Sequence, residues 1–290
     1  ATEPSATDAL LLERGARVYS AHCAACHGRR GDGRGSASAE VDPAPRDFTL
    51  GVYKWRSTPS GALPTERDLV RTVRVGAPGT SMPAFAGRLS DEEIRAVVAR
   101  VRAFSTRFRE EEIPSPVALP RRTPSLDDAA RRRGRGMYLL MQCWTCHGAR
   151  GRGDGPAAAT LRDDRGQPIA AYDFTRGFFR SGGRPLDVYR TFTTGVNGTP
   201  MPAYEEALSV GRDAFADLRT LRPVLDASGM RHLRTWVASM PTTETIANLP
   251  ERASAERSAR LRWDLVAYVM ALSEGNRAWR WLTTPLYPNP

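Results

Sequence analysis

A five-residue motif occurs twice in this chain and constrains its fold more than any other feature. It reads Cys-Ala-Ala-Cys-His at Cys23–His27 and Cys-Trp-Thr-Cys-His at Cys143–His147. The pattern C-x-x-C-H is typical of covalent haem c attachment, in which the two thiols add to the haem vinyl groups and the histidine becomes an axial iron ligand. The sequence therefore predicts two haem c groups. The predicted attachment residues are Cys23, Cys26, Cys143 and Cys146, and the predicted histidine ligands are His27 and His147.

All 4 cysteines of the 290-residue chain lie in these two motifs. None remains for a disulfide or for a thiolate ligand to iron. Two other uses of C-x-x-C are a thioredoxin-like redox pair and half of a zinc site. A redox pair needs neither the adjacent histidine nor a second copy, and the interval between the two pairs is far longer than the usual spacing of zinc ligands.

Further matched segments indicate that the two halves are duplicates of one plan. Each motif is followed by a glycine-rich loop and then by Asp-Phe-Thr, at Asp47–Thr49 and Asp173–Thr175. No strand pattern precedes the glycine loops and no phosphate-loop lysine follows, so we expect the glycines to let backbone pass close to a haem edge. The strongest match is between two segments whose corresponding residues are separated by a constant number of positions. Each segment consists of a short predicted helix, a glycine and a Met-Pro loop. Its main pairs are Asp68 with Asp187, Arg71 with Arg190, Gly76 with Gly195, Thr80 with Thr199, Met82 with Met201 and Pro83 with Pro202.

The Met-Pro loops supply candidates for the second axial ligand of each iron. Met82 follows His27 at nearly the same sequence interval as Met201 follows His147. A thioether is a soft ligand that suits low-spin iron and raises its reduction potential relative to a second imidazole. Neighbouring prolines restrict the loop and keep the sulfur in place. His232 is the alternative ligand for the second iron.

These paired C-x-x-C-H-G and G-T-x-M-P motifs resemble those of class I c-type cytochromes, duplicated as in dihaem periplasmic cytochromes of the c4 kind. The resemblance covers both halves through the Met loops and the final helices. It implies an all-α fold of two tandem cytochrome c domains, one-electron transfer and no catalytic residues. The larger format is similar to dihaem subunits that relay electrons to or from a respiratory oxidoreductase.

The sequence predicts domains at 1–113 and 127–290, joined by a proline-rich linker at 114–126. The second domain carries an insertion at about 205–256 that the first lacks. Helical periodicity and capping patterns predict six longer helices, one of which opens with a Ser90–Glu93 capping box. Their expected bounds are 8–22, 89–108, 126–142, 213–221, 227–240 and 259–273. Gly136 and Tyr138 indicate close packing of the 126–142 helix against another helix.

Charge and hydropathy limit the partners and the compartment. The net charge is +10, and the excess lies in the second half, because residues 1–115 carry only 17 of the 42 basic side chains but 15 of the 32 acidic ones. We therefore expect an acidic protein partner near the second domain. Nucleic acid is not expected, because no binding motif is present. The longest apolar run is far shorter than the ~20 residues of a membrane helix. Because haem c is attached after export, we expect a periplasmic protein whose signal peptide has been removed.

Several basic or aromatic residues are candidates for contacts with the haem propionates, since a guanidinium fork matches a carboxylate. Arg71 and Arg190 occupy matched positions, with surface salt bridges as the alternative. The other candidates follow the Asp-Phe-Thr segments and are Lys54, Trp55, Arg56 and Arg180. We read Asp68 and Asp187 as acids at helix N-termini, not as catalytic carboxylates.

Two further functions remain open at this point. Dihaem peroxidases also carry two C-x-x-C-H motifs, but they need an iron with an open coordination site, and dihaem thiosulfate dehydrogenases need a cysteine ligand. Two Met-Pro loops and the cysteine count argue against both. The chain is also compatible with a dedicated electron-transfer subunit of a larger complex, with the insertion and the 279–290 tail as docking surfaces.

Overall fold

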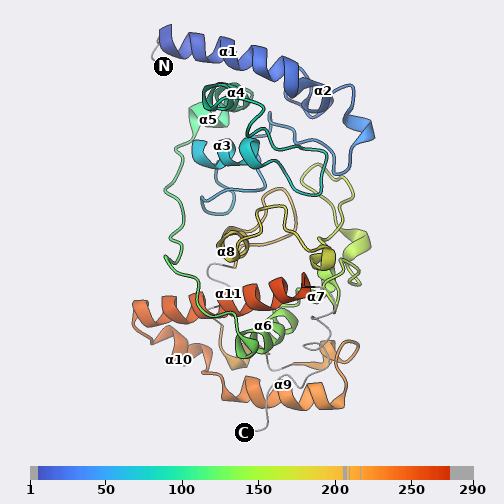
Figure 1. Ribbon diagram of the computed structural model, residues 1–290. Coiled ribbons are helices and arrows are strands. Elements are labelled where there is room, and N and C mark those ends of the chain that lie inside the picture. The colour runs from blue at the N-terminus through green and yellow to red at the C-terminus, as the bar shows by residue number, and fades with distance from the viewer. Residues whose placement is uncertain (1–5, 205–207, 209, 216, 275–290) are drawn as a thin grey trace. The chain divides into compact units, whose positions relative to one another are not determined.

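The computed structural model describes residues 6–204, 208, 210–215 and 217–274 (Figure 1). Helices and loops make up these residues. No strand occurs among them, and the two isolated bridges join Ala86 to Leu89 and Arg162 to Pro168. The predicted all-α fold class is confirmed. The predicted 279–290 docking tail lies outside the described residues.

The chain divides into two compact units. The first unit extends to Ala118 and also includes Val196–Met201, and the second comprises Leu119–Gly195 and the chain from Pro202 onward. The longer helices of the first unit are α1 (Ala6–His22), α3 (Glu66–Val75) and α4 (Asp91–Ala103), with short helices α2 (Ala24–His27), η1 (Ser38–Glu40) and α5 (Arg107–Glu110).

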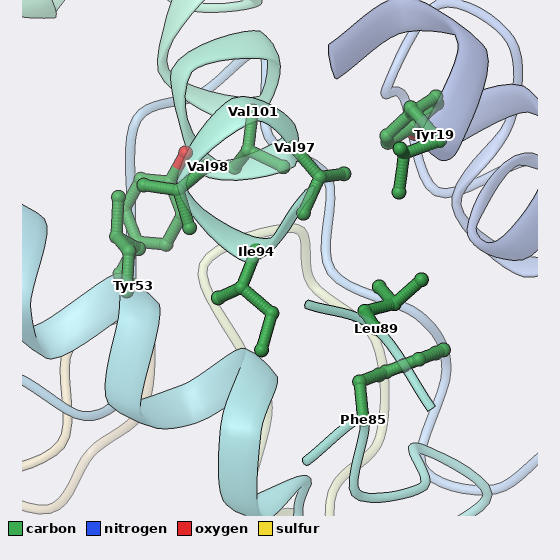
Figure 2. Packing of buried hydrophobic residues seen from close by; sticks show 10 residues of the cluster. Tyr19, Tyr53, Phe85, Leu89, Ile94, Val97, Val98 and Val101 are labelled. Carbon is green, nitrogen blue, oxygen red and sulfur yellow. The ribbon is translucent and has the colours of Figure 1, made fainter. Parts of the chain in front are cut away.

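The core of the first unit forms between α1, α3 and α4. Tyr19 of α1 and Ile94 of α4 belong to one cluster of buried residues, which Figure 2 shows from close by. The cluster consists of Val18, Tyr19, Tyr53, Leu69, Phe85, Leu89, Ile94, Val97, Val98 and Val101. The apolar positions of α4 recur at helical spacing, so one face of this helix is buried.

Local sequence explains where these helices begin. Ser90 and Glu93 form the predicted capping box, with the Glu93 amide 3.2 Å from the Ser90 hydroxyl. Thr65 and Asp68 form an equivalent box at the start of α3, which confirms Asp68 as an acid of a helix N-terminus. The predicted 89–108 helix is too long, because α4 ends at Ala103 and α5 forms a separate turn.

The second unit has three long helices, α6 (Asp128–Leu140), α9 (Ala227–Ser239) and α11 (Glu251–Leu272). The remaining helices are α7 (Trp144–His147), η2 (Ala158–Thr160), η3 (Phe174–Arg176), α8 (Pro185–Thr194), η4 (Arg212–Phe215), η5 (Arg219–Leu221) and α10 (Thr243–Ala247). In Figure 1, α11 lies between α8 on one side and α9 and α10 on the other.

The inserted segment differs in part from its prediction. The helix predicted at 227–240 is present as α9, but the one predicted at 213–221 is replaced by the short turns η4 and η5. The final helix begins at Glu251, well before its predicted start at 259, so the end of the insertion belongs to α11. Arg257 of α11 fastens the insertion by donating hydrogen bonds to the carbonyls of Leu208 (3.0 Å) and Val210 (3.3 Å).

A glycine lets two helices cross closely in each unit. A Cβ on Gly15 of α1 would lie 2.1 Å from the Ala96 carbonyl oxygen of α4, and one on Gly134 of α6 would lie 1.8 Å from the Asp264 carbonyl oxygen of α11. The close packing predicted for α6 is therefore present: Gly134 makes the close approach, Gly136 is buried as well, and the Tyr138 ring lies 5.2 Å from that of Tyr268. These crossings hold α1 and α6 in place, and each of these helices leads directly into a C-x-x-C-H motif.

Within the described residues, no helix is both long enough and apolar enough to cross a membrane.

Candidate haem attachment sites

The first motif continues the turn at the end of α1. The Cys23 amide donates to the Tyr19 carbonyl at 2.9 Å, and the His27 amide donates to the Cys23 carbonyl at 2.9 Å. Residues three and four apart on a helix share a face. Cys23, Cys26 and His27 are therefore presented together, and all three are partly buried.

The chemistry of the thiols does not suit a redox pair. Burial raises the pKa of Cys23 to about 11 and that of Cys143 to about 12. A reactive C-x-x-C pair requires a thiol whose pKa is lowered, because the thiolate is the nucleophile. The thioredoxin-like alternative is thus disfavoured by both environments.

A backbone carbonyl fixes the orientation of His27. Its Nδ1 lies 3.0 Å from the Arg46 carbonyl oxygen, and its ring stacks on Phe48 with centroids 4.5 Å apart and planes inclined by 22°. Because a carbonyl can only accept, Nδ1 carries the proton and Nε2 keeps its lone pair. Burial lowers the pKa of His27, which favours the neutral ring that binds iron.

The second motif repeats this arrangement. The Nδ1 of His147 lies 2.9 Å from the Tyr172 carbonyl oxygen, and its ring stacks on Phe174 at 4.5 Å and 23°. Burial again lowers the pKa of the imidazole. Two histidines in separate units therefore each offer Nε2 in the same way, although the residues that supply the carbonyls differ.

The glycine loops fold back onto the motif turns. Gly28 and Gly148 have positive φ values of 78° and 79°, and their carbonyls accept hydrogen bonds from the buried hydroxyls of Tyr19 (2.8 Å) and Tyr138 (2.7 Å). A Cβ on Gly35 would lie 2.1 Å from the Ala25 carbonyl oxygen. Close approach to protein backbone, which the sequence argument did not consider, accounts for this glycine.

The two Met-Pro loops share one hydrogen-bond pattern. In the first, Thr80 donates its hydroxyl proton to the Ala77 carbonyl (2.8 Å), and the same oxygen accepts from the Met82 amide (3.1 Å). The Ala77 amide donates to the Met82 carbonyl at 3.0 Å. The second loop repeats all three bonds with Val196, Thr199 and Met201, at 2.7, 3.2 and 3.1 Å. A cross-braced loop of this kind holds its methionine in a fixed place.

The first Met-Pro loop shares a core with the first motif, whereas the second loop, Val196–Met201, is grouped with the first unit, and the chain that follows it belongs to the unit of the second motif. Met82 packs against the buried cluster of the first unit, against which Cys23 and Phe48 also pack. In the second unit the hydroxyl of Tyr204, three residues after Met201, lies 4.0 Å from the Cys143 sulfur. His232, the alternative ligand, lies in α9 with Nδ1 3.5 Å from the Ser228 hydroxyl.

The candidates for propionate contacts lie in different environments. Arg56 is 1% exposed and donates from Nε to the Pro59 carbonyl (3.0 Å), and burial lowers its pKa to about 10. The Arg180 guanidinium lies 5.3 Å from the Tyr172 ring centroid. Arg190 contacts Asp187 at 3.4 Å, so the salt bridge considered as its alternative role is present. Arg71 of α3, Lys54 and Trp55 are partly buried.

Two buried groups that the sequence argument missed fit a ligand with acceptor atoms. The Tyr53 hydroxyl and the Trp144 Nε1 are buried and have no hydrogen-bond partner among the described residues. Buried donors without partners cost free energy, so an acceptor is expected there when the protein is complete. A haem, which carries two carboxylates, supplies acceptors of that kind. The available signal was position in the sequence: Tyr53 follows the first Asp-Phe-Thr segment, and Trp144 lies within the second motif.

Comparisons with known proteins agree with this geometry. Residues 11–99 match the family of cytochrome c oxidase, cbb3-type, subunit III. The CcoP subunit of the cbb3-type cytochrome c oxidase of Azospirillum brasilense is 35% identical over 95 residues, which are 33% of this chain and 29% of that protein. The chain thus spans less than a third of this relative. A chain of the reducing HAO-like protein complex of Kuenenia stuttgartiensis is 36% identical with a TM-score of 0.71, covering 90% of this chain and 96% of that one.

Proposed function

The chain belongs to the c-type cytochromes, and from this premise we propose that it binds two haems c and passes single electrons between redox proteins in the periplasm. The family membership carries haem c and electron transfer. The number of haems, their ligands and the compartment are the proposal. The observation that supports it most is the repeated histidine geometry, because both motifs present an imidazole Nε2 by the same bond to a backbone carbonyl.

We assign the residues of each site by role. Cys23 and Cys26 form the thioether bonds of the first haem, and Cys143 and Cys146 those of the second. His27 and Met82 are the axial ligands of the first iron, and His147 and Met201 those of the second. The shared hydrogen bonds of the Met-Pro loops support equal roles for the two methionines. Arg56 is the leading propionate contact, because it is the only one of these candidates that is fully buried, and the partly buried Arg180, Arg71, Arg190, Lys54 and Trp55 remain further candidates.

Bound haem supplies a one-electron Fe(III)/Fe(II) couple. The reaction is outer-sphere: one electron leaves a reduced redox protein and is later given to an oxidised one, with no bond formed and no proton transferred. The protein contributes fixed ligands and a dry environment. Tyr19 and Tyr138 lock the turns that carry the histidines, and the hydrogen bonds of the Met-Pro loops would keep each methionine in place for the iron.

The chain also suits a role as a subunit of an oxidoreductase complex. The two proteins it resembles are a subunit of a cbb3-type oxidase and a chain of an HAO-like complex. The match to the second covers nearly the whole of both chains. Exposed arginines follow both motifs, Arg29 and Arg30 in the first unit and Arg150 and Arg152 in the second, so the proposal of an acidic partner near the second unit rests on the larger positive excess of that half.

Intact mass spectrometry of the exported protein tests the number of haems. Two attached haems are expected in the wild type, and one each in Cys23→Ala/Cys26→Ala and Cys143→Ala/Cys146→Ala. Exposure to CO and peroxide separates carrier from enzyme. An electron carrier whose irons each have two protein ligands neither binds CO rapidly nor consumes peroxide. Rapid CO binding or peroxide turnover would support the peroxidase-like alternative.

A further inference from the structure

The carbonyl that orients each histidine comes from a different residue in the two units. In both units it lies two residues before the phenylalanine that stacks on the imidazole. That residue is Arg46 in the first unit and Tyr172 in the second. The two contacts are nearly identical, at 3.0 and 2.9 Å, so the main difference at this point is a positive charge.

The Arg46 charge is held near the ligand. Its backbone bonds to His27, and its terminal nitrogen Nη1 is buried. The Arg46 charge also acts on the buried Tyr53 hydroxyl, and the Tyr53 ring stacks at 6.1 Å on Phe48, the same ring that stacks on His27. At the second site the matching residue is the uncharged Tyr172, whose ring lies 6.0 Å from that of Phe174.

Other cations near the two sites do not cancel this difference. Arg180 lies over the Tyr172 ring, six residues after Phe174. The first unit also has a cation at the matching position, because Lys54 lies six residues after Phe48. Arg56, which is 1% exposed, adds another cation to the first unit, and Gly182 stands at the corresponding place. At the positions matched between the two Asp-Phe-Thr regions, the first unit therefore holds more buried positive charge, whereas the buried Arg262 of the second unit lies over the Tyr189 ring of α8.

We propose that Arg46 gives the first haem the higher reduction potential of the two, so that electrons taken up by the chain collect on the first unit. This rests on the proposed function. Oxidation of the iron adds one positive charge, and a nearby cation that is screened little from it disfavours the ferric form. The haem bound by His27 and Met82 is therefore the one that passes electrons on to the acceptor protein.

The overall charge would predict the opposite order. The second half has the larger positive excess, which alone would raise the potential of the second haem. Exposed charges, however, are screened over about 10 Å at 0.1 M salt, whereas buried charges are screened much less. One partly buried arginine beside the ligand therefore outweighs several on the surface.

Potentiometric titration of the holoprotein tests the order. We expect two one-electron steps in the wild type. Arg46→Tyr should lower the midpoint potential of the higher step. At a fixed potential the ratio of reduced to oxidised iron should fall by up to about tenfold, which is about 59 mV for a one-electron couple. Arg46→Lys keeps the charge and should stay near the wild type. Arg95→Gln, on the exposed side of α4, is the matched surface control and should move neither step.

Tyr172→Arg is the reciprocal variant and should raise the lower step, so the inference stays testable if Arg46→Tyr fails to mature. The proposal is overturned if Arg46→Tyr shifts neither step, or if it shifts the lower one. A protein with fewer than two redox steps contradicts the proposed function itself and removes the basis of this inference. Two steps that ignore Arg46 contradict only the order.

Discussion

The crossing of α6 and α11 leaves no room for a side chain at Gly134. A Cβ there would lie 1.8 Å from the Asp264 carbonyl oxygen, 2.5 Å from its carbon and 2.8 Å from the Tyr268 Cβ. Ordinary contact begins near 3.4 Å, so an added methyl group would force the two backbones apart locally. The bidentate pair of Arg133 with Asp264, at 2.7 and 2.9 Å, lies at the same crossing and would be pulled apart as well.

Gly134→Ala should therefore destabilise the second unit. Alanine gains about 1 kcal/mol over glycine in a helix interior. Overpacking a tight site costs about 1–3 kcal/mol and more where backbone must move. We expect a net loss of about 2 kcal/mol, which lowers the unfolding temperature by about 4–8 °C for a unit of this size. Because α6 leads into Cys143, the absorption spectrum of the second haem should also change at a lower temperature than in the wild type.

The assay is thermal unfolding of the mature protein, followed by helical circular dichroism. Gly229→Ala in α9 is the control, since its Cβ would meet side-chain atoms and no backbone, at 3.1 and 3.7 Å for Leu225 and 3.3 Å for the Asp226 carboxylate. The control should be neutral or slightly stabilising. Gly15→Ala, with a clash of 2.1 Å against α4, should destabilise the first unit in the same way. A Gly134→Ala protein as stable as the wild type would refute the steric argument.

Three further results are expected. Tyr138→Phe leaves the Gly148 carbonyl without its buried donor and should cost about 1–3 kcal/mol of unfolding free energy, measured by chemical denaturation; an unchanged midpoint would show that this bond is dispensable. Ser90→Ala removes a helix cap and should cost about 1 kcal/mol, whereas Ser90→Asp, which can also cap, should restore it. Burial raises the pKa of Asp264 in the folded protein. The stabilisation from its protonation is therefore greatest at pH values below the unfolded pKa of 3.8, and it is lost as the pH rises through the higher pKa of the folded state. Asp264→Asn should abolish this part of the pH dependence of the unfolding free energy.

The sequence alone was enough to predict the fold class and the positions of the candidate ligands. Covalent chemistry requires Cys-x-x-Cys-His in that order, and the duplication marks Met82 and Met201 among seven methionines. The start of α4 was also predictable, because the Ser90–Glu93 box is a local pattern. These features depend on neighbours in the sequence or on an internal repeat.

Features that depend on tertiary contact were not predictable. Nothing local distinguishes Gly134, which meets α11, from Gly136, and nothing in Arg46 or Tyr172 shows that their carbonyls face an imidazole. The helix predicted at 213–221 has suitable periodicity, yet the chain there forms two short turns. The inserted segment is instead held against α11 by a hydrogen bond from Arg257, a residue that lies after the insertion in the sequence. The repeat of Phe48 and Phe174 was visible, but their stacking role required the structure.

The central claim is that each iron is held by one histidine and one methionine, and absorption spectroscopy of the oxidised protein tests it most directly. Methionine-ligated ferric haem has a characteristic sulfur-to-iron charge-transfer band. We predict that Met82→Leu and Met201→Leu each remove about half of this band and that the double variant removes all of it. Met230→Leu, a buried methionine of α9, should leave the band intact. A band that survives undiminished in either ligand variant, or high-spin iron in the wild type, would contradict the account.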